Sequence, residues 1–288
     1  MPNRRSGDKR ILARPGPPGD LFVTRVGALA LALLISGCTG ISGEGLVLPD
    51  STPSEFEGGL RLPEGTVLRF EKQESHDVNL PGASTASSRR WGVVLRILGA
   101  TPDGAVRVSW EMGSKPVWQF LIGTTGTIRE QTHVRPEGED DIGLWRFVLA
   151  ELIGMRRVRA GDVFARQERI DLPYPWTEIK GVDAAHEVRL RRFVSFRRCW
   201  AAEFEYSLRL QSASPPIMKL PGTSFRLDRV MLKGRASLDV RTGVLLEGNY
   251  ELSLEGKVDD NPTAQGIGIK VRDLLRLRRE SMEALGCT

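Results

Sequence analysis

Apolar and polar residues alternate along the segment 230–258. The apolar residues occupy even positions: Val230, Leu232, Ala236, Leu238 and Val240, then Val244, Leu246, Tyr250, Leu252, Leu254 and Val258. Charged and other polar residues fill most of the odd positions between them. Since successive side chains of a strand point to opposite faces, the pattern predicts two long strands with one buried face.

The tripeptide Arg-Thr-Gly at 241–243 separates these two strands. A three-residue hairpin loop favours glycine in the left-handed conformation, which predicts that conformation for Gly243. The register then gives the cross-strand pairs Val240–Val244, Ala236–Gly248 and Gly234–Tyr250. An aromatic ring opposite a glycine covers the gap that the missing side chain leaves.

Similar alternation and turn signals predict further strands. They cover 66–78, 90–98, 106–112, 118–122, 188–196 and 204–210. Apolar residues at helical spacing predict one helix over 140–154 and a second over roughly 267–285. The chain is therefore expected to be mainly β (α+β). We expect a long curved antiparallel meander sheet of about eight to ten strands, as a half-barrel or open barrel, with one or two capping helices.

The first 37 residues have the composition of an export signal. Six basic residues precede or flank an apolar run from Val26 to Ile35, which is shorter than the roughly 20 residues that span a bilayer. Small residues, Ser36 and Gly37, stand directly before Cys38. An ordinary signal peptide and an uncleaved anchor are the alternatives.

The order Leu-Ile-Ser-Gly-Cys at 34–38 resembles the lipobox of bacterial lipoproteins. The resemblance implies that the Cys38 thiol is alkylated by diacylglycerol and that the chain is cut before it. The new amino terminus is then acylated, typically with palmitate. Thr39 stands where inner-membrane lipoproteins of Gram-negative bacteria carry aspartate, so the resemblance implies anchoring in the outer membrane if the source is Gram-negative.

The domain organisation follows from this signal. We expect a lipoprotein signal peptide over 1–37, a flexible tether over 38–62, rich in Gly, Ser, Pro and Thr, and a single β-rich envelope domain over 63–288. Residues 1–37 hold six of the 41 basic and two of the 36 acidic residues, which leaves 35 and 34. This near balance argues against nucleic-acid binding despite a sequence pI of 9.3.

Two cysteines, Cys199 and Cys287, remain after Cys38. An even pair in an exported protein predicts a disulfide between them. The alternative is two unpaired buried thiols. It draws support from Cys199, which occupies an odd position, on the polar side of its strand.

The sequence shows no catalytic, cofactor-binding or metal-binding signature. The three histidines, His76, His133 and His186, have no partner at metal-ligand spacing, and the acidic clusters at 137–141 and 259–260 match no calcium loop. The loop 171–178, with a tyrosine and a tryptophan among prolines, could fold back on the domain or contact lipid. We therefore expect a protein that is not an enzyme.

The expected architecture is similar to that of half-barrel envelope carriers that hold acyl chains, such as the outer-membrane lipoprotein carrier. This resemblance implies a lipid or other lipophilic ligand in the concave apolar face. The candidate lining residues are Phe204, Tyr206, Leu208, Leu232, Leu238, Leu246, Tyr250, Leu252 and Leu254. The alternative is a structural or assembly lipoprotein without a ligand cavity, which docks a partner protein in the envelope.

Overall fold

The computed structural model describes most of the chain beyond residue 50. The described residues are 11–12, 51–80, 82–113, 115–123, 128–133, 145–170, 182–196, 198–210, 217–220, 223–258 and 266–287. Of the predicted signal peptide, only residues 11–12 are among them. Cys38, the acidic clusters at 137–141 and 259–260 and the loop 171–178 lie outside them.

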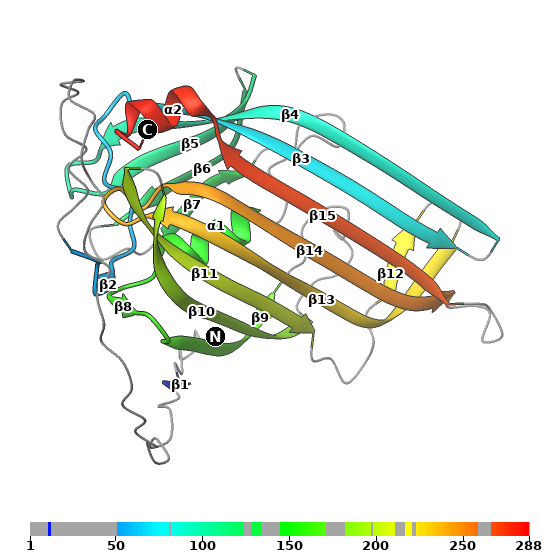
Figure 1. Ribbon diagram of the computed structural model, residues 1–288. Helices are drawn as coiled ribbons and strands as arrows, with labels where there is room; N and C mark the ends of the chain where they lie inside the picture. Colours follow the sequence, from blue (N-terminus) through cyan, green and yellow to red (C-terminus); the bar gives the residue numbers. More distant parts are fainter. Residues whose placement is uncertain are drawn as a thin grey trace, which may run out of the picture.

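Two groups of consecutive antiparallel strands form one long sheet (Figure 1). The first group is β3 (Val67–Leu80), β4 (Ala83–Ala100), β5 (Val106–Met112), β6 (Lys115–Ile122) and β7 (Ile128–His133). The second group is β9 (Val163–Ile170), β10 (Val182–Phe196), β11 (Cys199–Leu210), β13 (Thr223–Asp239), β14 (Leu245–Val258) and β15 (Ile267–Leu277). Pairing of β15 with β3 joins the groups, while β7 stays an edge, so the sheet is not closed.

The remaining strands are short. β1 (Ile11–Leu12) pairs with β9, β12 (Ile217–Leu220) pairs with β13, and β2 (Glu55–Phe56) pairs with β8 (Val158–Arg159) in a separate two-stranded sheet. The large sheet thus has 13 strands rather than eight to ten. The expectation of a mainly β protein with a long antiparallel sheet and few helices is confirmed.

The predicted hairpin is formed by β13 and β14. Gly234 pairs with Tyr250, Ala236 pairs with Gly248, and Gly243 has a φ of 70°. The expected pair Val240–Val244 is wrong, because the register shifts at the hairpin end and Leu238 pairs with Leu245. The Val240 amide instead donates to the carbonyl of Trp200.

The second predicted helix is also wrong, because residues 267–277 form strand β15. The odd positions Ile267, Ile269, Val271, Leu275 and Leu277 are buried, and so is Asp273 between them. The helical interpretation failed because the buried position 273 carries a carboxylate, which interrupts the apolar alternation. Only the short helix α2 (Arg279–Ala284) follows the strand.

Helix α1 (Trp145–Ile153) falls within the first predicted helix and packs on one side of the sheet (Figure 1). We call this side the inner face and the opposite side the outer face. The buried α1 residues Trp145, Val148, Leu149, Leu152 and Ile153 belong to the same apolar core as the inner face.

Part of the predicted tether is packed against the domain. Phe56 is fully buried, and its ring lies edge-on to Phe204 with the centroids 5.2 Å apart. The Gly58 amide donates to the carbonyl of Met155 at 2.9 Å. The packed chain therefore begins earlier than residue 63.

Candidate functional site

The nine residues expected to line a lipid cavity lie together on the inner face, within the core. Each is at most 4% exposed. Helix α1 contributes to covering them, since the Trp145 and Tyr250 rings have centroids 5.4 Å apart. The structure thus brings the predicted residues together as a packed core.

Glycines allow this close packing. A Cβ atom at Gly248 would lie 2.6 Å from the Trp145 ring, and one at Gly234 would lie 2.5 Å from the Tyr206 hydroxyl. The aromatic ring that covers Gly234 is therefore Tyr206 on the neighbouring strand β11. Its hydroxyl donates a hydrogen bond to the backbone carbonyl of Asn249 at 2.8 Å.

A charged cluster interrupts the apolar inner face where β3 and β15 run side by side. Lys72 Nζ lies 2.7 Å from Asp273 Oδ2 and 2.8 Å from Glu74 Oε2. The same ammonium group lies 4.4 Å from the centroid of the Trp91 ring. The Lys72 side chain is 1% exposed and that of Asp273 is 0% exposed, so this pair is isolated from solvent and must be satisfied internally.

The Asp273 carboxylate also accepts hydrogen bonds from Trp145 Nε1 at 2.9 Å and from the Tyr250 hydroxyl at 3.0 Å. Burial raises the pKa of Asp273 to about 7, although Lys72 opposes the shift. Burial alone would raise the pKa of Glu74, but a hydrogen bond with His76 and the charge of Lys72 lower it to about 2. The cluster thus joins α1, β3, β14 and β15 through one set of polar contacts.

Sequence reasoning missed this cluster. Lys72, Glu74 and His76 continue the even, inward positions of Leu68 and Phe70 on β3. The sequence feature that could have predicted the cluster is Lys72 itself, a lysine at a position of β3 where the alternation requires an inward side chain. Its partner Asp273 was hidden because its segment was interpreted as a helix.

The outer face carries an open groove of about 920 Å³ across β3, β10, β11, β13, β14 and β15. Its charged side chains at the surface are Arg189, Lys233, Arg235, Arg272 and Glu187, which are exposed, and Glu205 and Glu251, which are half-buried. Uncharged polar residues between them are Gln73, Ser75, Ser207 and Asn249. Of the nine predicted lining residues, Tyr206 and Tyr250 border this groove. Most of its lining residues are charged or polar, whereas the sequence predicted an apolar lipid cavity.

Cross-strand ion pairs organise the outer face. Glu205 lies 3.0 Å from Arg191 and 3.1 Å from Arg235. Glu251 lies 3.1 Å from Arg272 and 3.5 Å from Lys233. Each exposed pair stabilises the fold by at most about 1 kcal/mol, so these contacts mainly fix where the charges stand.

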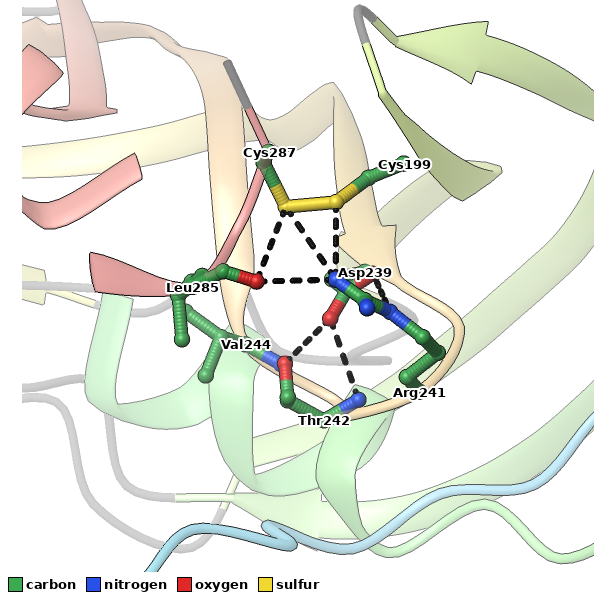
Figure 2. Close-up of a disulfide and its surroundings, with 7 residues drawn as sticks. All are labelled: Cys199, Asp239, Arg241, Thr242, Val244, Leu285 and Cys287. Atoms are coloured by element: carbon green, nitrogen blue, oxygen red, sulfur yellow. Dashed lines mark hydrogen bonds and ion pairs between the residues drawn. A yellow bond between two sulfur atoms is a disulfide. The ribbon is translucent and has the colours of Figure 1, made fainter. Parts of the chain in front are cut away.

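The disulfide expected between Cys199 and Cys287 is present and ties the C-terminus to β11 (Figure 2). Both cysteines are buried, at 2% and 0% exposure. The polar-side argument against the bridge is wrong because Ala201 and Ala202 are both buried. The alternation changes phase there, which turns Cys199 inward.

The histidines occupy separate places. His76 Nε2 lies 2.6 Å from Glu74 Oε1, and His186 Nδ1 lies 3.8 Å from Glu151 Oε2 of α1. His133 ends β7 and pairs with Trp118. Among the described residues, the metal-ligating side chains that converge are Cys199, Asp239 and Cys287.

No protein-family model and no curated protein matches the chain. One similar solved structure is DynF from the dynemicin biosynthesis pathway of Micromonospora chersina, with 10% identity and a TM-score of 0.24 over 85% of this chain and 95% of that one. Another is a conserved protein of unknown function with a hot dog fold from Alicyclobacillus acidocaldarius, with 12% identity and a TM-score of 0.13 over 76% of this chain and 80% of that one. Both likenesses are too low to support an argument about function. Within the described residues, no helix is long and apolar enough to cross a membrane.

Proposed function

We propose that the protein is a non-enzymatic, lipid-anchored protein of the cell envelope that docks a partner protein in the groove on its outer face. Lipid on Cys38 holds it at the membrane, in the outer membrane if the source is Gram-negative. The unclosed sheet is a half-barrel whose interior is filled by its own side chains and capped by α1 and α2. The observation that carries the proposal is the groove on the outer face, which is lined mainly by charged and polar side chains. The nine residues predicted to line a lipid cavity are instead packed in the core.

Charge on the groove favours an acidic segment of the partner. Four basic side chains and four acidic ones line it. One of the acidic side chains, Asp273, is sealed from solvent beside Lys72, which leaves three carboxylates at the surface of the groove. The basic groups are 48–62% exposed and the acidic groups 27–50% exposed. Positive charge therefore extends further into solvent, and it would attract and orient carboxylates of the partner. Hydroxyl and amide groups of Ser207 and Asn249 supply hydrogen bonds between the charges.

A pair of serine variants tests this proposal. Ser207 lines the groove, whereas Ser237 lies on the same outer face of β13 outside it, and both are half-buried. We expect Ser207→Trp to fill the groove and abolish capture of a stoichiometric, acidic partner from solubilised envelopes by the lipidated full-length protein. The variant Ser237→Trp should retain capture. Equal capture by the two variants, or no partner with the wild type, would contradict the proposal.

A second candidate is binding of a lipid or other lipophilic ligand against the inner face. The observation that favours it is a mismatch of lengths. β13 has 17 residues and spans about 55 Å, whereas α1 has nine residues and spans about 13 Å. Apolar residues continue along β14 beyond Tyr250 to Leu252 and Leu254.

Native mass spectrometry separates the two candidates. The variant Cys38→Ser, exported and purified without detergent, should show a single bare mass if the inner face is filled by the chain itself. A bound mass that organic extraction removes would instead support the lipophilic ligand and would identify its class.

A further inference from the structure

Three metal-ligating atoms converge where the C-terminus meets the β13–β14 hairpin (Figure 2). The sulfur atoms of Cys199 and Cys287 and a carboxylate oxygen of Asp239 all lie within 4.8 Å of one another. All three residues are at most 2% exposed. We propose that these side chains bind a zinc-class divalent cation when the Cys199–Cys287 disulfide is reduced, a site that does not depend on the docking function.

The donor set suits such an ion. Thiolates and carboxylates bind Zn²⁺ in tetrahedral sites, with Zn–S distances of about 2.3 Å. The two sulfur atoms of such a site stand about 3.8 Å apart by that geometry. Cys199 and Cys287 have their Cα atoms 5.0 Å apart, so their sulfur atoms can separate by side-chain rotation once the covalent bond is broken.

Asp239 provides a second, independent observation. Its Oδ2 accepts hydrogen bonds from the Thr242 amide at 3.1 Å and the Thr242 hydroxyl at 2.6 Å. Its Oδ1 is buried and accepts no hydrogen bond within the described structure. Buried carboxylate oxygens are normally paired. One oxygen is thus held in place by the hairpin while the other remains available for a ligand, as in carboxylates oriented by outer-shell contacts.

Arg241 balances the charge of the site. Two thiolates, one carboxylate and one divalent cation carry a net charge of minus one, and the Arg241 guanidinium neutralises it. Its Nη2 lies 3.0 Å from Cys199 Sγ and 3.7 Å from Cys287 Sγ, and its Nε lies 3.8 Å from Asp239 Oδ1. Since the Arg241 side chain is 55% exposed, it has room to move aside for the ion. A neighbouring guanidinium also favours the thiolate form of cysteine.

The Leu285 carbonyl is a candidate fourth ligand. It lies 3.9 Å from Cys287 Sγ and now accepts a hydrogen bond from Arg241. Formation of the site needs a reductant. A phosphine reduces the disulfide to two thiols and becomes a phosphine oxide, with the oxygen and both protons supplied by water. The two thiols then release their protons as the thiolates bind the cation.

Titration of the full-length protein with Co²⁺ tests the proposal. After anaerobic reduction with a phosphine, we expect one equivalent of Co²⁺ to produce a thiolate-to-cobalt charge-transfer band and the strong visible bands of tetrahedral cobalt. Zn²⁺ should displace it, and the oxidised protein should give no band. Absence of the charge-transfer band from the reduced protein would overturn the proposal.

Variants at the carboxylate assign the third ligand. Asp239→Asn should weaken Co²⁺ binding by about tenfold or more, whereas Asp183→Asn, an exposed carboxylate on β10, should leave it unchanged. If Asp239→Asn does not fold by circular dichroism, Thr242→Val removes one hydrogen bond to Oδ2 and should weaken binding to a smaller extent. Unchanged affinity in a folded Asp239→Asn variant would exclude Asp239 as a ligand. Unchanged affinity in Thr242→Val would contradict orientation of the carboxylate by the hairpin.

Discussion

The ammonium group of Lys72 lies 2.7 Å from the carboxylate of Asp273, and both side chains are sealed from solvent. This pair joins the first strand of one half of the sheet to the last strand of the other half. It lies where β15 pairs with β3, which joins two groups of strands that are far apart in the sequence. Four further polar groups, from Glu74, Trp145, Tyr250 and His76, complete the cluster around it.

Removal of the Lys72 charge should strongly destabilise the fold. Lys72→Met leaves Asp273 and Glu74 without their cation, and breaking a buried pair from one side typically costs about 3–5 kcal/mol. Arg235→Met, which removes an exposed partner of Glu205, should cost less than about 1 kcal/mol. Urea denaturation at neutral pH measures both.

The double variant Lys72→Met/Asp273→Asn extends this test. It removes both formal charges of the pair, so we expect it to be more stable than Lys72→Met alone. A cost for Lys72→Met no greater than that for Arg235→Met would contradict the buried ion pair.

Gly248→Ala should reveal the contact between α1 and the sheet. The added methyl group would lie 2.6 Å from the Trp145 ring, and overpacking of this kind costs about 1–3 kcal/mol. In a Trp145→Leu background the ring is absent, so the same substitution should cost less. A double-mutant cycle in urea measures this coupling, and strictly additive effects would argue against the contact.

His186 should make the fold less stable as the pH falls. Burial, together with the charge of Arg166, lowers its pKa from 6.5 to about 4. The unfolded chain therefore binds a proton below pH 6.5 that the folded chain does not bind, so stability is lost as the pH falls from 6.5 towards 4. Between about pH 7.5 and 5.5 this loss amounts to about 1 kcal/mol.

The variant His186→Gln isolates this contribution. The glutamine amide does not titrate. The difference in unfolding free energy between wild type and variant should therefore change by about 1 kcal/mol between about pH 7.5 and 5.5. Subtraction removes the titration of Asp273, whose raised pKa acts in the opposite direction. A difference that is independent of pH would show that His186 is not buried as a neutral imidazole.

Loss of the disulfide should weaken the fold through the unfolded chain. The bridge closes a loop between residues 88 positions apart, and removal of a native disulfide typically costs about 2–5 kcal/mol. We expect reduction of the wild type and the double variant Cys199→Ser/Cys287→Ser to lower the unfolding free energy by similar amounts. Metal-free buffer avoids stabilisation of the reduced form, and a reductant should have no effect on the double variant.

The sequence alone determined the strands whose alternation is uninterrupted. The pairs Gly234–Tyr250 and Ala236–Gly248 and the left-handed Gly243 followed from the local pattern and the loop length, because hairpin pairing is a short-range property. The pairing of Cys199 with Cys287 followed from their number. The export signal and Cys38 remain predictions, since residues 11–12 are the only part of the first 50 residues that the structure describes.

Only the tertiary structure decided the rest. A buried carboxylate at position 273 is unfavourable in an isolated strand. In the folded protein β15 pairs with β3, and Lys72 of β3 supplies the positive charge that stabilises Asp273. Close packing of the apolar face around Gly234 and Gly248 was likewise decided by the tertiary structure, because these glycines let Tyr206 and Trp145 of α1 approach the sheet closely. The outer groove is formed by six strands from both halves of the chain. The sequence could not predict it, because the pairing of strands that are far apart in the sequence does not affect the local periodicity of any one strand.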